Sequence, residues 1–461
     1  MSADLRAEER RPPRRRRYPM GQITLRGIHP AARKRYTRRK PLADLETPPK
    51  QVSIPLELCA GCAPAVPVVK EGAQVRVGQL IARPGDENGV SVHASVSGTV
   101  EGIMDCPHPW GGTGPAIVIR SDGKGTLADD LPDPVDTAHL VPQVLIQRVR
   151  QAGIVGMGGD AGPTHVKLAQ AMGRVDTLIV DAAECEPYNT ADQRLLADRG
   201  DLLLQGALAL SQAIRAKRVV LAAQGDQIKT VEKLERWLLK KKISIEIVLL
   251  RSHYPLGEER QIVRAVTGRE VPPGGAPVDV KCLVLNAATV YAVSEAMLHG
   301  DPLTHRAVTV SGRGVARPRN LWVPIGTPLR DLLACAGGLR EEEVLFLIGG
   351  PMRGVEQKDL SAPVLPDTNS LICMLKEERA ESGPQTPCVR CGRCAAACPM
   401  RLVPAFVARA FRLNDLSRLP ALHPQDCLQC GCCTYICPSQ IPLMDVMRRA
   451  RDIVEKEGDR P

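Results

Sequence analysis

Sixteen cysteines occur in this 461-residue chain, and eight of them form two runs near its end. The runs read CVRCGRCAAACP at 388–399 and CLQCGCCTYICP at 427–438. Each places four cysteines at C-x2-C-x2-C-x3-C with a proline directly after the fourth, which is the spacing that bacterial proteins use to hold two [4Fe-4S] clusters. Because no export signal is present, metal binding is expected rather than a disulfide framework.

The two runs predict two sets of ligands. In such a pair, the first three thiolates of a run bind one cluster and the fourth reaches the other. Structural zinc also uses C-x2-C pairs, but zinc does not explain four cysteines and a trailing proline in both runs. Cys432 is not expected to be a ligand, because Cys433 keeps the spacing. The predicted sets are Cys388, Cys391, Cys394 and Cys437 for one cluster, and Cys427, Cys430, Cys433 and Cys398 for the other.

A helix is expected between the runs. The 28 residues that separate them repeat apolar side chains at Leu402, Phe406, Ala410 and Leu413, with helical spacing. This predicts a ferredoxin-like unit with helices packed around the clusters. The lone pair of Cys59 and Cys62 is interpreted as buried or incidental thiols, since no second pair lies nearby in the sequence.

A second stretch that could do chemistry is GIVGMGGDAGPTHVKL at 153–168. Glycine loops bind phosphate because bare backbone N–H groups can converge on it, and Lys167 would add a positive charge. Asp160, in the middle of the loop, opposes an anionic ligand. The alternative is a tight turn at a helix N-terminus that binds nothing.

Positive charge is concentrated at the N-terminus. The first 40 residues contain 14 Lys/Arg and 3 Asp/Glu, whereas the rest contain 47 and 48. Residues 1–20 are therefore expected to be a basic disordered tail that is either simply solvated or attaches to anionic lipid or an acidic partner. Nucleic acid is not favoured, because no aromatic residues interleave with this charge. No apolar run of 18 residues occurs, so no transmembrane helix is expected, and no apolar stretch resembling a secretory signal follows the charges.

The remaining sequence predicts a multidomain α+β protein. Residues 50–122 have the rhythm of two β-rich halves of a biotinyl/lipoyl-type hammerhead with glycines at the turns, but without the attachment lysine. Residues 123–140 are expected to be a linker. From 141 to about 300, helices alternate with buried strands expected at 175–183, 218–225, 243–250 and 281–288, which favours an α/β domain with a largely parallel sheet. Residues 301–375 are β-rich around one helix, and a small β-grasp domain fits them.

These residues together resemble one family, the C subunits of the Rnf electron-transport complex, over about residues 21–450. The resemblance implies five segments: the tail 1–20, a barrel-sandwich hybrid at 21–125, a Rossmann-like FMN/NADH domain at 140–300, a β-grasp domain of the soluble-ligand-binding type at 301–376, and a helical two-cluster ferredoxin domain at 380–447. The matching stretches are GIHP (27–30), HASVSG (93–98), GIVGMGG (153–159), PTHVKL (163–168), AECEPY (183–188), TAD (190–192), YPLGEERQ (254–261), TGREVP (267–272), GDPLTHRAVTVSG (300–312) and IGGPM (348–352).

The resemblance implies an electron-entry or electron-exit subunit on the cytoplasmic face of the bacterial inner membrane. NADH would transfer a hydride to a noncovalent FMN, and single electrons would pass to the two clusters and onward through other membrane subunits to ferredoxin, in either direction. No residue is expected to be catalytic in its own right. The implied FMN and NADH contacts are Gly156, Gly158, Gly159, Lys167, Asp181, Glu184, Glu186, Tyr188, Asp192, Tyr254, Gly257, Glu259, Asn286 and Thr289.

The chain departs from the family pattern around the predicted flavin loop. The usual GGAGFPT reads GGDAGPT at 158–164, so an aromatic residue is missing and an acid is added. Asp181 stands where the family has asparagine, and GDQI at 225–228 replaces EDNK. Two alternatives therefore stay open. One is a relay or scaffold subunit with intact clusters and a degenerate flavin site, and the other is a reductase of the cobalamin-reductase type that shares the fold.

Overall fold

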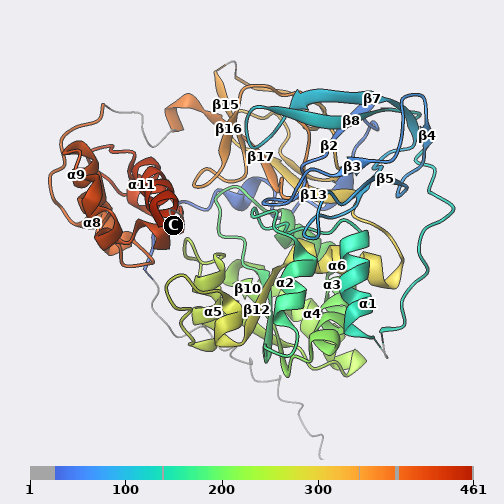
Figure 1. The fold of residues 1–461 in the computed structure, drawn as a ribbon, viewed down its shortest axis with the longest axis horizontal. Helices are drawn as coiled ribbons and strands as arrows, with labels where there is room; N and C mark the ends of the chain where they lie inside the picture. The colour runs from blue at the N-terminus through green and yellow to red at the C-terminus, as the bar shows by residue number, and fades with distance from the viewer. Residues whose placement is uncertain (1–25, 138–139, 342, 379–383, 459–461) are drawn as a thin grey trace, which may run out of the picture.

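A computed structural model describes residues 26–137, 140–341, 343–378 and 384–458. The predicted tail at 1–20 lies outside the described residues. Figure 1 shows an α/β domain at the base of the view, two β-rich domains above it, and a small helical domain with the cysteine runs at the left. Among the helices that the structure describes, none is both long and apolar enough to cross a membrane.

The N-terminal β domain consists of two small sheets facing each other across an apolar core. Alternating side chains of β2 and β8, including Ile54 and Ile119, are fully buried between the sheets. One sheet has the order β2-β8-β7-β4 and the other β3-β5-β6. The strands are β2 (Gln51–Pro55), β3 (Val66–Pro67), β4 (Gln74–Val75), β5 (Leu80–Arg83), β6 (Val92–His93), β7 (Gly98–Pro107) and β8 (Thr113–Ser121).

The interpretation of Cys59 and Cys62 as incidental thiols was wrong. The two residues form a disulfide within the turn that follows β2, where their Cα atoms lie 5.5 Å apart. This separation is within the usual range for disulfides. Neither residue lies near the cysteine runs in the sequence, and no third cysteine of the described chain joins them.

The α/β domain has a fully parallel sheet of order β11-β10-β9-β12, as the buried strand patterns predicted. Its strands are β9 (Thr177–Ala182), β10 (Arg218–Gln224), β11 (Glu246–Leu250) and β12 (Cys282–Asn286). One face packs against a core formed by five helices, and the other face packs mainly against α5. The helices are α1 (Pro142–Gln151), α2 (Thr164–Ala171), α3 (Ala191–Ile214), α4 (Ile228–Lys241), α5 (Glu259–Thr267) and α6 (Ala287–Leu298).

The second β domain contains a mixed sheet of order β1-β14-β13-β17-β15-β16 with α7 (Leu329–Cys335) packed on it. β13 (His305–Ser311) runs antiparallel to β14 (Arg319–Pro324) and parallel to β17 (Ser370–Leu375). β15 (Val344–Ile348) and β16 (Val355–Gln357) complete one edge. At the other edge, β1 (Leu42–Asp44) is added from the N-terminal part of the chain, which ties distant segments together.

The helical domain confirms the helix expected between the cysteine runs but corrects its buried face. Its helices are α8 (Arg393–Ala397), α9 (Pro404–Arg412), α10 (Cys432–Tyr435) and α11 (Leu443–Gly458). α9 buries Val407 and Ala410 against α11, whereas Phe406 and Leu413 are 56% and 60% exposed. Leu413 follows the end of the helix, and Phe406 lies one position before the Val407 stripe, so both point away from this core.

Candidate flavin cavity and cluster loops

A cavity of about 900 Å³ lies beyond the carboxyl ends of the parallel strands. This is the position where ligands bind in open α/β sheets. Walls from the second β domain and from the second cysteine run close it. Of the fourteen predicted flavin or NADH contacts, thirteen line it: Gly156, Gly158, Gly159, Lys167, Asp181, Glu184, Glu186, Asp192, Tyr254, Gly257, Glu259, Asn286 and Thr289.

The predicted site residue outside this set is Tyr188. Its φ of 67° turns the chain away after the AECEPY stretch. The side chain is buried, stacks on Tyr36 with ring centroids 6.3 Å apart, and donates a hydrogen bond of 3.0 Å to Glu378. Tyr188 therefore lies in the contact between the α/β domain and the second β domain rather than on the cavity wall.

The glycine loop forms one wall of the cavity and ends at α2. Gly156 N–H donates to the Gly162 carbonyl, which closes the loop, and Met157 N–H donates to the Thr289 hydroxyl at 2.9 Å. A side chain at Gly158 would meet Asn286 at 3.3 Å, so glycine is needed for this close approach. Gly159 has a φ of 104°, which other residues rarely adopt.

Asp160 folds back over the loop. A Cβ atom built on Gly156 would lie 2.0 Å from Asp160 Oδ1, so the carboxylate occupies the space that the glycine leaves open. Asp160 still lines the cavity. Burial raises the pKa of Asp367 at the same cavity, and the charge of Asp160 adds a smaller contribution in the same direction. The negative charge therefore stays beside the site even though the carboxylate rests on the loop.

Glu184 stabilises the start of α3. Its carboxylate accepts hydrogen bonds from the backbone N–H groups of Asp192 and Gln193, at 3.2 and 3.4 Å, which suits the positive end of a helix dipole. Burial raises the pKa of Glu184 to about 7, and the charge of Lys34 opposes this rise. The buried Lys34 ammonium donates to the Glu184 carbonyl.

Lys34 is a residue that sequence reasoning missed. It was counted in the positive charge of the first 40 residues but lies outside the predicted tail at 1–20, and it is 4% exposed. The residues around Lys34 in the sequence form no apolar pattern that would predict a buried side chain, so the sequence alone gives no signal for its role.

Two more acids lie beside the cavity, Asp192 buried and Asp181 half-buried. Asp181 accepts a hydrogen bond from Ala183 N–H, and Asp192 accepts one of 2.7 Å from the Asn286 amide. Burial raises the pKa of both, Asp181 most strongly. Behind them the fully buried guanidinium of Arg306, which was not predicted, donates to the carbonyls of Pro366 and Met157 and partly offsets the charge of Asp192.

Tyr254 connects the cavity to the second cysteine run. Its hydroxyl lies 2.7 Å from the Cys430 carbonyl, to which it donates, and 3.3 Å from Glu186. Glu186 also accepts from Met352 N–H at 3.1 Å, and a side chain at Gly350 would collide with it. Burial raises the pKa of Glu186 to about 7. One buried chain of contacts therefore joins three domains at this point.

The opposite end of the cavity carries an ion pair. Lys167 on α2 pairs with Glu259 at the start of α5. The preceding residue, Glu258, caps α5 by accepting from Arg260 and Gln261 N–H at 3.0 and 3.2 Å. At Gly257 a Cβ atom would lie 2.7 Å from the Ala183 carbonyl, so this glycine allows the loop to pass close to the end of β9.

The two cysteine runs adopt matching backbone conformations, as expected for a repeated unit. Arg390 and Gln429 both have positive φ, as do Gly392 and Gly431. The first thiol of each run accepts a backbone hydrogen bond: Arg390 N–H donates to Cys388 and Gln429 N–H donates to Cys427, both at 3.4 Å.

Thiols from the two runs lie together at two places in this domain. A small cavity is lined by Cys398 from the first run together with Cys427, Cys430 and Cys433 from the second, and also by Cys432. Burial, followed by the charges of Cys430 and Cys398, raises the pKa of Cys427 to about 11. Cys437 packs near Cys394 across the domain. Each run therefore contributes its fourth cysteine toward the other.

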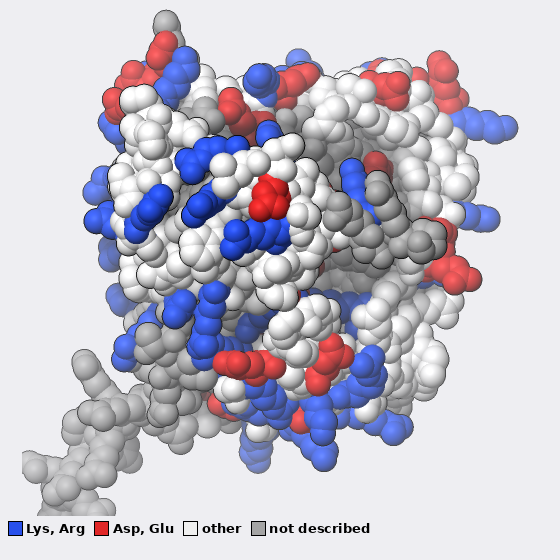
Figure 2. All heavy atoms as spheres, turned by 60° about the vertical axis from the view of Figure 1, so that its left-hand side comes forward, with Lys and Arg blue, Asp and Glu red and all other residues white. Residues whose placement is uncertain are grey.

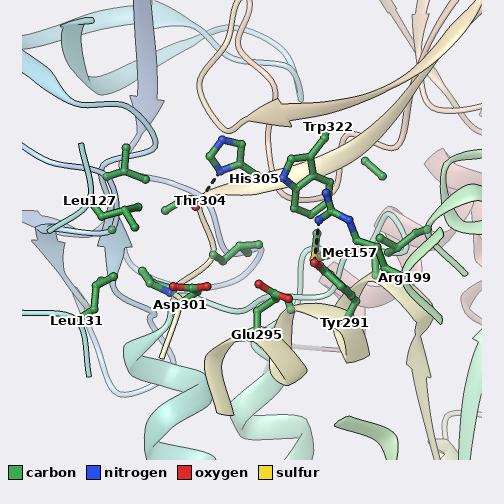
Figure 3. A pocket seen from close by; sticks show the side chains of 18 residues that line it. Leu127, Leu131, Met157, Arg199, Tyr291, Glu295, Asp301, Thr304, His305 and Trp322 are labelled. Carbon is green, nitrogen blue, oxygen red and sulfur yellow. Dashed lines mark hydrogen bonds between the residues drawn. The ribbon is translucent and has the colours of Figure 1, made fainter. Parts of the chain in front are cut away.

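A second cavity, of about 230 Å³, lies among the α/β domain and the two β domains and shares no lining residue with the first. Figure 3 shows Arg199 beside the Tyr291 and Trp322 rings, with Glu295 and Asp301 on the floor. The guanidinium lies 4.2 Å from the centre of the Trp322 ring and donates to the Tyr291 hydroxyl at 2.8 Å. The positive charge of Arg199 is therefore stabilised by a cation–π contact. None of the predicted site residues lines this cavity.

The residues of the first cavity fit a flavin mononucleotide. The Thr164 hydroxyl and Asp192 Oδ1 line the cavity, are buried, and have no hydrogen-bond partner in the described protein, and buried polar atoms normally have one. The hydroxyl suits a phosphate oxygen at the glycine loop, and the carboxylate oxygen suits a ligand hydroxyl or N–H. The eight thiols of the runs likewise fit two [4Fe-4S] clusters.

Family models match four parts of the chain. They are the RnfC barrel sandwich hybrid domain at residues 24–124, the Nuo51 FMN-binding domain at 149–295, the SLBB domain at 307–356 and the 4Fe-4S dicluster domain at 387–441. The chain therefore has a flavin domain for FMN and a ferredoxin domain for [4Fe-4S] clusters. The barrel-sandwich interpretation of the N-terminal β domain is confirmed.

Relatives that match this chain along most of their length are C subunits of ion-translocating oxidoreductase complexes. The chain is 37% identical to the C subunit of the proton-translocating ferredoxin:NAD(+) oxidoreductase complex of Clostridium ljungdahlii, over 83% of this chain and 83% of that protein. It is 36% identical to the C subunit of the ion-translocating oxidoreductase complex of Rhodobacter capsulatus, over 87% and 77%. It is 34% identical to the C subunit of the Na(+)-translocating ferredoxin:NAD(+) oxidoreductase complex of Acetobacterium woodii, over 84% and 87%.

Among solved structures, an NAD+-reducing [NiFe]-hydrogenase in the air-oxidized state has a similar fold. The TM-score is 0.51 at 18% identity, over 71% of this chain and 69% of that one. At this identity the likeness concerns the fold alone. The sequence relatives and the domain matches together place the chain: it belongs to the family of C subunits of Rnf-type ion-translocating oxidoreductase complexes.

Proposed function

We propose that this chain is the subunit of its complex at which electrons are exchanged with NAD(H), in the cavity beyond the parallel sheet. FMN, when bound, links a two-electron donor to one-electron carriers, and the two [4Fe-4S] clusters carry single electrons. The protein's own part is to position NAD(H), to keep water out and to hold protons on buried acids. Electrons then pass through other subunits toward ferredoxin.

The observation that carries this proposal is the shared wall between cavity and cluster loop. Cys427, Leu428 and Gln429 line the cavity from the ferredoxin domain, opposite the glycine loop. Tyr254 spans the remaining gap, with its hydroxyl on the Cys430 carbonyl. A ligand in this cavity would be in contact with the second cysteine run, which is the arrangement that electron transfer between them requires.

The acids of the cavity would control its charge. Glu184 and Glu186 have pKa values raised to about 7 by burial, so each can hold or release a proton near neutral pH. Glu184 keeps the start of α3 in place through its two backbone hydrogen bonds. Glu186 fixes the turn at residues 350–352 of the second β domain against the cavity. We propose that the predicted flavin and NADH contacts that line the cavity bind or position these ligands, and that Tyr188 does not.

The same geometry supports an order for the two clusters. The set of Cys427, Cys430, Cys433 and Cys398 lies next to the cavity. The other set, Cys388, Cys391, Cys394 and Cys437, begins with two exposed thiols. We therefore infer that electrons pass between the cavity and the outside of the complex through the first set and then the second.

Two finer assignments of fold are also part of this proposal. The strand order β14-β13-β17-β15-β16, with α7 following β14 along the chain, supports a β-grasp domain. The parallel β11-β10-β9-β12 sheet supports a Rossmann-like flavin domain. We further infer that the chain is a peripheral subunit on the cytoplasmic face of the bacterial inner membrane, in line with the complexes for which its relatives are named.

The experiment is an anaerobic NADH titration of the purified chain. Flavin released by acid and iron are first measured per chain. Bleaching of the flavin and cluster absorbance by NADH supports the proposal. Iron without flavin, or clusters that NADH leaves oxidised while dithionite reduces them, would contradict it and favour a relay subunit with a degenerate flavin site, the alternative that Asp160 keeps open.

A pair of glycine variants sharpens this test. Gly158→Val adds a side chain against Asn286 at the cavity wall, where the first added carbon would already lie 3.3 Å from its neighbour. Gly114→Val is the matched control, because a side chain there meets nothing within 4 Å. We expect Gly158→Val to lose flavin and keep its iron, and Gly114→Val to keep both.

A further inference from the structure

One aromatic side chain with an open face lines the first cavity. Of the aromatic residues that the structure describes, Trp110 and Tyr254 lie on the cavity wall. Tyr254 is 1% exposed, and its hydroxyl is bonded to the Cys430 carbonyl. Trp110 is 38% exposed. The glycine loop at 153–162 contains no aromatic residue, so Trp110 is the flat side chain that a ligand in this cavity would meet.

Trp110 comes from the N-terminal β domain, at the turn between β7 and β8. Gly111 and Gly112 follow it with φ of 111° and 76°, so the chain can reverse directly after the tryptophan. Backbone hydrogen bonds close the turn: His108 N–H donates to the Gly112 carbonyl at 3.0 Å, and Gly111 N–H donates to the His108 carbonyl at 2.9 Å. The turn therefore holds Trp110 at one place on the cavity wall.

The indole ring is also fixed by contacts of its own. Its N–H donates to Asp367 Oδ2 of the second β domain at 2.9 Å, and the His108 ring packs edge-on against it with ring centroids 4.9 Å apart. Nearby, the Gln357 amide donates to the Pro109 carbonyl at 2.6 Å. The ring is thus ordered by the protein, which lowers the entropy cost of binding a ligand against it.

The same cavity provides positive charge for a ligand with phosphate groups. Arg260 on α5 and Arg353 line it, and within the described chain neither pairs with a carboxylate. Arg260 donates to the Gly275 carbonyl at 3.1 Å, while its Nη1 is buried without a partner in the described protein. Figure 2, which brings the side of the ferredoxin domain forward, shows Lys and Arg side chains gathered over that face, with Asp and Glu mainly toward its edges. An anionic ligand with a flat ring, such as a nucleotide, suits these features.

The surroundings of Trp110 indicate which part of a nucleotide it would contact. The carboxylate of Asp367 beside the indole is unfavourable for a phosphate group, so a ring is expected there. Hydride transfer requires the nicotinamide ring to lie against the flavin, where water is kept out. The adenine ring of NAD(H) does not react, so it can lie against a side chain that is partly open to solvent.

We propose that Trp110 is the stacking residue for the adenine ring of NAD(H), on the wall of the cavity that the N-terminal β domain forms. Such a stack uses the π face of the base and needs no base-specific hydrogen bond, so the indole N–H can stay bonded to Asp367. Trp110 supplies affinity and orientation for the substrate and takes no part in hydride transfer. This inference rests on the proposed function, in that the cavity must take NAD(H).

The test measures binding without electron transfer. The oxidised holoprotein is titrated by calorimetry with ADP-ribose, which has the adenine end of NAD+ but no nicotinamide. In Trp110→Leu we expect the dissociation constant for ADP-ribose to rise about tenfold, within the range for base–aromatic stacking, with flavin and iron contents unchanged. Trp110→Phe keeps a ring and should lose less affinity. Met104→Ala removes an exposed apolar side chain from β7 of the same hairpin, away from the cavity, and is expected to bind like wild type.

Several results would overturn the inference. Wild type that does not bind ADP-ribose contradicts it, as does equal affinity in wild type and Trp110→Leu or an equal loss in Met104→Ala. Loss of flavin from Trp110→Leu also contradicts it, because the indole would then belong to the flavin site. So does a variant that binds ADP-ribose like wild type but binds nicotinamide mononucleotide more weakly, since the indole would then meet the other ring.

Reduction of wild type by NADH, followed by the flavin and cluster absorbance, reports on the proposed function separately. Bleaching by NADH together with unchanged ADP-ribose binding in Trp110→Leu refutes the role of Trp110 alone. Loss of ADP-ribose binding in Trp110→Leu, in a protein that NADH does not reduce, refutes the proposed electron exchange and leaves the adenine contact standing.

Discussion

Replacing Glu186 by glutamine tests whether the Glu186 carboxyl is protonated in the folded protein and whether its ionisation lowers the free energy of unfolding. The carboxyl is buried where the α/β domain, the second β domain and the cysteine run meet, and burial raises its pKa from 4.5 to about 7. Each pKa unit corresponds to about 1.4 kcal/mol. Ionised Glu186 should therefore cost the fold about 3 kcal/mol.

The direction in which stability changes with pH follows from the linkage between proton binding and folding. Because the folded pKa lies above the unfolded one, the native state holds the proton more tightly, and wild type loses stability as pH rises from 4.5 to about 7. Above that range the loss is complete. Glutamine keeps an oxygen to accept from Met352 N–H and has an amide N–H that can donate to the Tyr254 hydroxyl, but it cannot ionise. The variant should therefore gain on wild type by less than about 1 kcal/mol at about pH 5 and by about 3 kcal/mol at about pH 8.5.

Urea unfolding at the two pH values measures this difference. Trp237 on α4 is the tryptophan of the α/β domain, and a Trp110→Phe/Trp322→Phe background leaves it as the reporter. Glu232→Gln removes an exposed carboxylate from α4 and serves as the control. A difference between Glu186→Gln and its background that stays constant with pH would refute the reasoning, as would a variant that becomes relatively less stable at the higher pH.

Three further predictions concern the other parts of the site. Cys391→Ser should lower the iron content of the anaerobic protein by about half, whereas Cys432→Ser should leave it unchanged; equal iron in the two variants would contradict the ligand assignment. Asp160→Asn should tighten FMN binding several-fold, because about 1 kcal/mol of repulsion from the carboxylate is removed, and fluorescence titration of flavin-stripped protein measures this; unaltered or weaker affinity would mean that the carboxylate does not oppose the ligand. Arg306→Met should destabilise the protein by about 3 kcal/mol or more in urea unfolding, since it leaves three carbonyls and the nearby acids of the cavity without their buried cation; a loss below about 1 kcal/mol would disagree with that role.

The glycine loop illustrates how far the sequence reached. Its glycines, the following helix and the cavity beyond the parallel sheet were all predictable, because a glycine-rich turn after a helix and before another has few alternatives. The sequence also identified Asp160 as the residue that opposes an anion. Where its carboxylate lies was a different matter: it depends on the empty space over Gly156, which appears only once the loop is closed by the hydrogen bond from Gly156 to Gly162.

Other misses have the same origin. Lys34 and Arg306 look like ordinary surface charges in the sequence, yet they are buried against acids that come from distant segments. Tyr188 follows two true cavity residues in the chain, but its left-handed backbone turns it into a domain contact. The apolar positions of α9 had helical spacing, and only packing against α11 decided which of them were buried.

The sequence by itself determined the chemistry that depends on spacing along the chain: the two cysteine runs, the parallel strands with their intervening helices, and the order of the domains. These features are local, since thiol spacing and hydrophobic periodicity act within a few turns of chain. Only the tertiary structure decided which cysteine run faces the flavin cavity, through Tyr254 and the wall of residues 427–429, and which is left exposed. That choice arises from contacts between residues far apart in the chain, such as Tyr254 and Cys430, which no local pattern encodes.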